Sequence, residues 1–130
     1  MSYQTILAIG TGGFIGAILR VYLNGFVNSK ITHTLPFGTL GVNLLGSLLM
    51  GALVAYFFYS SNISIHTKSF LTTGILGALT TYSTFAIESF LLLQGGSLFY
   101  GFLNMFLNVF GSISFTAIGY FSIHYLFKNP

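Results

Sequence analysis

Thr80-Thr81-Tyr82-Ser83-Thr84-Phe85 interrupts an apolar segment, residues 70–93, that is long enough to cross a bilayer. A helix that faces lipid has no use for four hydroxyl side chains and a tyrosine in succession. Gly74 and Gly77 lie just upstream, so we expect this helix to break near the membrane midplane. Non-helical backbone is tolerated at that depth only where it is buried in protein or lines a wet cavity. Broken helices also supply ion sites in membrane proteins, so we expect the chain to bind or move an ion.

The composition places the whole chain in a membrane. Of its 130 residues, 54% are hydrophobic and only 4% are charged, whereas a soluble domain carries about 25% charged residues. The length allows four apolar spans of about 20 residues each. The first segment is too long for a signal peptide and is expected to stay as a span. We therefore predict an all-α, single four-span transmembrane domain, 1–130, with spans near residues 5–27, 40–59, 70–93 and 98–127.

The positions of the basic residues do not predict which way the protein is oriented in the membrane. With four spans, Lys68 and Lys128 lie on the side of both termini, and Arg20 and Lys30 lie on the other. Basic residues in short loops normally set orientation, and here the count is two against two. One interpretation is that the protein inserts both ways up and pairs as an antiparallel, dual-topology homodimer. The other is that a protein with few charges gives an uninformative count.

Polar residues recur at helical spacing in the second span. Thr39, Asn43 and Ser47 are four residues apart and share a helix face. An asparagine inside a span either bonds across helices, which contributes about 0.6 kcal/mol on average, or presents its amide hydrogens to an anion. The sequence leaves both roles open for Asn43.

The fourth span repeats this pattern with Asn104, Asn108, Ser112 and Thr116. Each step of four residues overshoots an α-helical turn by about 40°, so the four groups form a slowly winding stripe. Such a stripe suits either a pathway lining or a hydrogen-bonded helix interface. Four polar residues in strict register favour the pathway.

Isolated charges and small residues add three expectations. Arg20 is expected to reach the membrane interface and make a structural bond, with attraction of an anion as the alternative. Glu88 is the only acid, and an intramembrane acid is a functional hypothesis by default; proton coupling, a place at a pathway mouth and simple hydrogen bonding remain open for it. Gly12 and Gly16 form a small-xxx-small pair that favours close helix packing.

The three histidines are isolated from one another, and we expect neither a metal centre built from them nor an enzyme.

Three segments together resemble one family. They are Gly-Gly-Phe-Ile-Gly-Ala-Ile-Leu-Arg at 12–20, Gly-Thr-Leu-Gly-Val-Asn-Leu-Leu-Gly at 38–46, and Gly-Ile-Leu-Gly-Ala-Leu-Thr-Thr-Tyr-Ser-Thr-Phe at 74–85. Their order, spacing and four-span frame resemble the CrcB/Fluc fluoride channels of bacteria, and the match covers nearly the whole chain. The resemblance implies a multi-pass protein of the bacterial inner membrane that confers fluoride resistance. It implies passive export of fluoride that enters the cell as the neutral acid and ionises inside.

The resemblance also implies an assembly and a set of site residues. It implies a dual-topology homodimer with two fluoride pathways and a structural sodium ion at its centre, bound by the backbone carbonyls of Gly77 and Thr80. The residues implied for the fluoride pathway are Thr39, Asn43, Tyr82, Ser83, Thr84, Phe85, Ser112 and Thr116. Tyr82 stands where the family usually has phenylalanine; it keeps the ring edge and adds a hydroxyl donor.

The chemistry of fluoride agrees with this interpretation, and two rivals remain. Fluoride holds its water tightly, so its path must offer hydrogen-bond donors while still allowing release. Serine, threonine and asparagine do this without a fixed charge, and a nearby cation would offset the cost of bringing an anion to the midplane. The main rival is a small proton-coupled multidrug antiporter, which centres on a carboxylate in its first span, where this chain has none. A second rival, a non-transporting membrane subunit, would explain the glycines but not the polar stripes.

Overall fold

The computed structural model describes residues 1–128, and all regular structure in this part of the chain is helical. Four helices are long and apolar enough to cross a membrane. The first two are α1 (Tyr3–Lys30) and α2 (Phe37–Tyr59). The third, Ile65–Gln94, comprises α3 (Ile65–Ser69), the π-helical η1 (Phe70–Leu76), α4 (Gly77–Leu79) and α5 (Tyr82–Gln94), and the fourth, Leu98–Lys128, comprises α6 (Leu98–Phe106), the π-helical η2 (Leu107–Gly111) and α7 (Ser112–Lys128).

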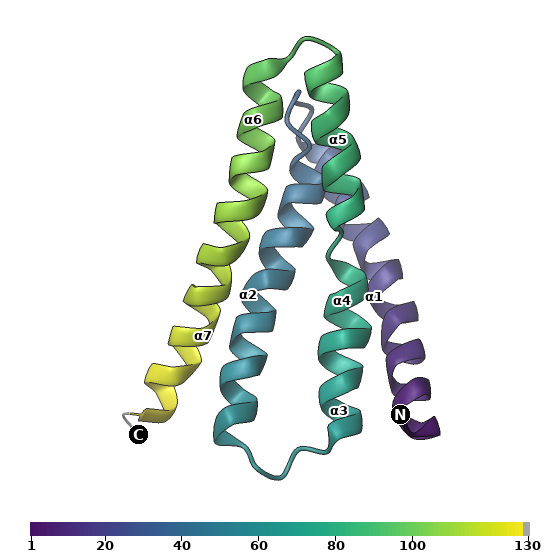
Figure 1. Cartoon of the computed structure of the whole chain (residues 1–130), viewed down its shortest axis with the longest axis vertical. Coiled ribbons are helices and arrows are strands. Elements are labelled where there is room, and N and C mark those ends of the chain that lie inside the picture. Colours follow the sequence, from purple (N-terminus) through teal and green to yellow (C-terminus); the bar gives the residue numbers. More distant parts are fainter. Residues whose placement is uncertain (129–130) are drawn as a thin grey trace.

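The four helices run alternately up and down, so that the N-terminus and the C-terminal end of α7 lie at the same end of the molecule (Figure 1). Along the bundle, α7 packs on α2, η1 packs on α1, and α5 packs on α6. The four-span prediction is confirmed, although helix ends differ from the expected ones by up to five residues. The third helix begins at Ile65 because Ser64 Oγ accepts a hydrogen bond from the Thr67 N–H and starts the helix in polar sequence.

The third helix breaks in its middle, as predicted (Figure 1). Thr80 and Thr81 have extended backbone conformations, with ψ angles of 153° and 105°. Thr81 then caps α5 through its side chain, which accepts from the Thr84 N–H. The helix runs through Gly74 and Gly77 without interruption, so these glycines do not make the break themselves.

The glycines instead bring helix backbones into contact. A Cβ added to Gly12 would lie 2.5 Å from the carbonyl oxygen of Phe70, and one added to Gly74 would lie 2.9 Å from the Cα of Gly12. A Cβ on Gly16 would lie 2.1 Å from the carbonyl oxygen of Ile75. The expected small-xxx-small packing of α1 is thus confirmed, and its partner is the half of the third helix that precedes the break.

The interior is unusually polar and the surface is apolar. Only 11% of the most apolar window of α1, and 11% of that of the fourth helix, is buried within the chain. Large hydrophobic side chains cover the outside, as suits contact with lipid tails. The buried polar residues are Thr39, Asn43, Thr81, Ser89, Asn104 and Asn108. Buried polar groups need hydrogen-bond partners, because the surrounding bilayer supplies no water.

Candidate functional site

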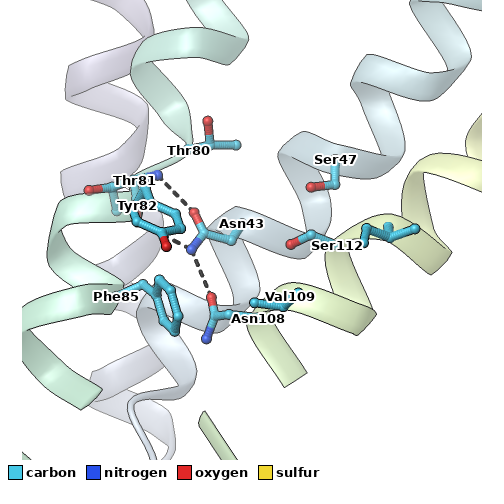
Figure 2. A pocket seen from close by; sticks show the side chains of 10 residues that line it. Asn43, Ser47, Thr80, Thr81, Tyr82, Phe85, Asn108, Val109 and Ser112 are labelled. Carbon is cyan, nitrogen blue, oxygen red and sulfur yellow. Dashed lines mark hydrogen bonds between the residues drawn. The ribbon is translucent and has the colours of Figure 1, made fainter. Parts of the chain in front are cut away.

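Asn43 joins α2 to the break in the third helix. Its Oδ1 accepts from the Thr81 N–H at 2.8 Å, and its Nδ2 donates to the Thr81 carbonyl at 3.3 Å (Figure 2). The amide side chain thereby satisfies both backbone groups of Thr81 that an unbroken helix would have paired. Unpaired backbone groups cost several kcal/mol in a membrane, so Asn43 stabilises the extended turn. The side chain is only 8% exposed.

A series of buried side chains, here called the amide relay, continues from Asn43 through Asn108 and Asn104 to Ser89. Asn43 Nδ2 donates to Asn108 Oδ1 at 2.8 Å, and Asn108 Nδ2 donates to Asn104 Oδ1 at 2.9 Å. Asn104 Nδ2 donates to Ser89 Oγ at 2.9 Å, and Ser89 Oγ donates to the Phe85 carbonyl at 2.8 Å. The relay therefore connects α2, η2, α6 and α5.

A cavity of about 340 Å³ lies beside the break (Figure 2). Figure 2 shows the hydroxyl oxygens of Ser47 and Ser112 on the side toward Asn43, with no hydrogen bond to the other residues drawn. The opposite wall is aromatic, because the rings of Tyr82 and Phe85 meet edge to face with centroids 5.2 Å apart. Ring edges are electropositive and hydroxyl groups can donate hydrogen bonds, so both walls carry groups that are able to interact with an anion. The cavity is lined by Asn43, Ser47, Thr80, Thr81, Tyr82, Phe85, Asn108, Val109, Ser112 and Ile113.

The wide turn of η2 changes how the stripe of the fourth helix winds. Asn108 lies within η2, and the Ser112 N–H that follows it donates to the carbonyls of Asn108 and Val109. A π-helical turn holds more residues than an α-helical one, so a step of four residues no longer overshoots there. Asn108 and Ser112 both reach the same cavity. The first member of the stripe, Asn104, is fully buried in the relay.

Four of the eight residues expected on the pathway line this cavity, and four do not. The cavity brings together Asn43, Tyr82, Phe85 and Ser112. Thr116 lies in a separate groove on α7 beside Tyr120. Ser83 is exposed on α5, and Thr39 is buried against Glu88. Thr84 lines a second cavity.

The second cavity, of about 380 Å³, is lined in part by Arg20, one of the two basic residues of α1. Arg20, Asn24, Thr81 and Thr84 are among its lining residues, and Thr81 also lines the first cavity. None of the side-chain hydrogen bonds within residues 1–128 involves Arg20, so the expected structural bond is not made there. Arg20 instead places a positive charge beside the broken helix.

Glu88 is held by a threonine of α2. Thr39 Oγ1 donates to Glu88 Oε1 at 2.7 Å, and Asn24 Nδ2 donates to Thr39 Oγ1 at 3.2 Å. Glu88 Oε2 is buried and has no hydrogen-bond partner among residues 1–128. The Thr39 hydroxyl therefore donates its hydrogen bond to Glu88, and Thr39 does not line the first cavity.

The break also frees two backbone carbonyls. In a continuous helix the Thr81 N–H would pair with Gly77, and the Thr84 N–H would pair with Thr80. Here the Thr81 N–H donates to Asn43 Oδ1, and the Thr84 N–H donates to Thr81 Oγ1 at 3.3 Å. The carbonyls of Gly77 and Thr80 lose their helical donors and are able to accept from another partner.

Sequence reasoning left several participants out of the proposed site. Ser47 and Asn108 were visible in the polar stripes, and Thr81 lies within the hydroxyl run that predicted the break. Ser89 carried no signal, because it sits in an apolar run next to Glu88. Only the packing of α6 on α5 shows that Ser89 faces Asn104.

Within residues 1–128, four apolar helices, one of them broken beside a cavity with several polar side chains in its wall, define a small multi-pass membrane protein. Residues 7–120 match the family described as "CrcB-like protein, Camphor Resistance (CrcB)", and the chain belongs to this family. The "Fluoride-specific ion channel FluC" of Sulfurimonas denitrificans is 63% identical over 123 residues, which cover 95% of each chain. Proteins of the same name from Nautilia profundicola and Campylobacter lari are each 48% identical, over 98% and 89% of this chain and over 100% and 94% of their own lengths.

Proposed function

We propose that the chain is a fluoride-selective channel of the bacterial inner membrane that lets cytoplasmic fluoride leave passively. The single observation that carries this proposal is the near full-length similarity, up to 63% identity, to proteins named fluoride-specific ion channels. The relatives are named as channels and not as enzymes, which favours transport without catalysis. The hydroxyl and amide side chains in the wall of the cavity at the broken helix support the same conclusion from chemistry.

The lining of the cavity suits a small, strongly hydrated anion. Hydroxyl groups of Ser47 and Ser112 and the electropositive edges of Tyr82 and Phe85 replace water around the ion. No lysine or arginine lines this cavity within the described residues. An anion would therefore bind without being trapped, since conduction requires release as well as entry. Arg20, in the neighbouring cavity, would raise the local concentration of anions.

The working form in this proposal is an antiparallel homodimer with one pathway along each chain. Equal numbers of basic residues at the two ends support insertion in both orientations. Tyr82 is 77% exposed although it adjoins the break. A second copy would cover its hydroxyl group, which lipid would solvate poorly.

A sodium ion at the centre of this dimer would use the carbonyls that the break frees. Gly77 is exposed, and its carbonyl and that of Thr80 have lost their helical donors. Carbonyl oxygen is a suitable ligand for a hard cation, and two opposed breaks would each contribute two. When bound, such an ion supplies positive charge that offsets the cost of an anion at the midplane.

The test is fluoride flux through the purified protein in liposomes. Vesicles loaded with potassium fluoride are given valinomycin, and a fluoride electrode records efflux. We expect rapid fluoride efflux and no chloride efflux from matched vesicles loaded with potassium chloride. Absence of fluoride efflux would reject the channel proposal. A flux of lipophilic cations driven by a proton gradient would instead identify the multidrug antiporter.

A further inference from the structure

All the side-chain bonds of the amide relay point the same way. Its first donor is the Thr81 backbone N–H, which can only donate, and its last acceptor is the Phe85 carbonyl, which can only accept. Between them, each asparagine accepts through Oδ1 and donates through Nδ2 to the next member. If one asparagine turned over, oxygen would face oxygen and nitrogen would face nitrogen. The two backbone ends therefore fix the orientation of every amide between them.

This orientation matters most at Asn43 and Asn108, because both line the cavity beside the break. Asn43 keeps its oxygen toward the Thr81 N–H and its amide hydrogens toward Asn108 and the Thr81 carbonyl. Turned over, Asn43 would lose both bonds to Thr81 and would offer its oxygen where the amide hydrogens now lie. An acceptor at that place would repel an anion, whereas the NH₂ group, both of whose hydrogens already donate to Asn108 and Thr81, leaves a positive partial charge on the cavity wall.

The two remaining members of the relay do not line the cavity. Ser89 is 4% exposed and Asn104 is fully buried, and both lie on the α5–α6 hairpin. Ser89 Oγ is the acceptor for Asn104 Nδ2. A buried amide that loses its acceptor pays the desolvation cost of the unpaired group. Without the Ser89 hydroxyl, the present orientation of Asn104 is stabilised only by the bond that its Oδ1 accepts from Asn108 Nδ2. Asn108 Nδ2 also donates to the Asn104 backbone carbonyl at 3.1 Å, so losing Ser89 weakens the hold on Asn108 without removing it.

We propose that Ser89 and Asn104 are positioning residues for the anion path. They act through Asn108 to keep the amide hydrogens of Asn43 directed along the cavity wall and its oxygen on the break. The inference rests on the proposed function, because it assigns these residues a role only if an anion crosses this cavity. The ligand class is a small anion that accepts hydrogen bonds.

The test compares two serines that make the same local bond. Ser122 Oγ donates to the Ile118 carbonyl four residues earlier, as Ser89 Oγ donates to Phe85, but Ser122 is exposed and outside the relay. Ser89→Ala and Ser122→Ala therefore remove the same group and the same kind of helix bond. We expect Ser89→Ala to slow fluoride efflux from liposomes at least tenfold and Ser122→Ala to leave it within twofold of the wild type. Ser89→Thr, which keeps the hydroxyl, should retain most of the flux.

Hydrogen–deuterium exchange of the purified protein adds a readout that needs no flux. We expect Ser89→Ala to speed exchange in a peptide that covers the break, residues 79–86, while peptides from α1 and α7 stay unchanged. Uniformly faster exchange would show general destabilisation and overturn the positioning role. Normal efflux in Ser89→Ala beside an active wild type would overturn this inference alone. No efflux from the wild type would overturn the proposed function, and this inference with it.

Discussion

Replacing Asn43 with aspartate exchanges the amide NH₂ for an oxygen and leaves the shape of the side chain unchanged. Asn43 Nδ2 donates to Asn108 Oδ1 at 2.8 Å and to the Thr81 carbonyl at 3.3 Å, so Asn43→Asp sets oxygen against oxygen at both places. An anion in the middle of a cavity of about 340 Å³ lies about 4 Å from the wall, where two like charges repel by about 4 kcal/mol at an effective dielectric constant of about 20. Because each 1.4 kcal/mol is a factor of about ten, we expect fluoride efflux to fall by about a thousandfold.

The assay for Asn43→Asp is efflux from fluoride-loaded liposomes under a potassium/valinomycin potential, near neutral pH. Asn62→Asp is the matched control, since it adds the same charge to an exposed loop between α2 and α3. Asn43→Asp keeps the bond that Oδ1 accepts from the Thr81 N–H but loses two hydrogen bonds and buries a charge, so thermal unfolding and size-exclusion chromatography must show that the variant still folds before its flux is interpreted. If Asn43→Asp conducted as fast as Asn62→Asp, an anion path along Asn43 would be refuted.

Four further perturbations test other parts of the molecule. Phe85→Ile removes the ring edge that meets Tyr82 at 5.2 Å, and we expect much slower fluoride efflux with an unchanged elution volume; normal flux would move the pathway elsewhere. Gly51→Ala would place a Cβ 2.0 Å from the Thr116 carbonyl oxygen, so it should lower stability by about 1–3 kcal/mol in thermal unfolding, whereas Gly10→Ala meets nothing within 4 Å and should not. Replacing sodium by a large organic cation on both sides should reduce efflux, and an equal rate would argue against a structural sodium ion. A C-terminal tag should react with an impermeant label from both sides of the membrane in one population, and labelling from one side alone would rule out dual topology.

The membrane setting explains how much of the fold the sequence predicts. Backbone and polar side chains inside a bilayer need internal partners, so a hydroxyl run within an apolar span is a strong signal for a break. The same rule predicts that the polar face of α2 meets that break, and Asn43 does bond to Thr81. Asn43, Phe85 and Ser112, which come from three different spans, line one cavity.

Several features escape the sequence because they depend on tertiary packing or on local helix geometry. Strict spacing of four gave Asn104 and Thr116 the same weight as Ser112, although one is buried in the relay and the other lies in a separate groove. The π-helical turn lies between Asn104 and Ser112, and no pattern in the amino-acid sequence marks it. The resemblance places Thr39 beside the pathway, but in the structure its hydroxyl donates to Glu88. The two residues are far apart in the sequence, so no local pattern predicts this hydrogen bond.

The wide turn at Leu107–Gly111 behaves as an insertion of one residue that the fourth helix has absorbed without a loop. Each residue of an α-helix turns the chain by about 100° and advances it by about 1.5 Å. An absorbed residue leaves α7 aligned with α2, whereas a residue added to or deleted from an α-helical part of the same helix would rotate all of α7, including its Ser112 hydroxyl, by about 100°. The wide turn is consequently a place where the fourth helix can lose one residue and keep this alignment, provided that Asn108, which lies in the cavity wall, is retained.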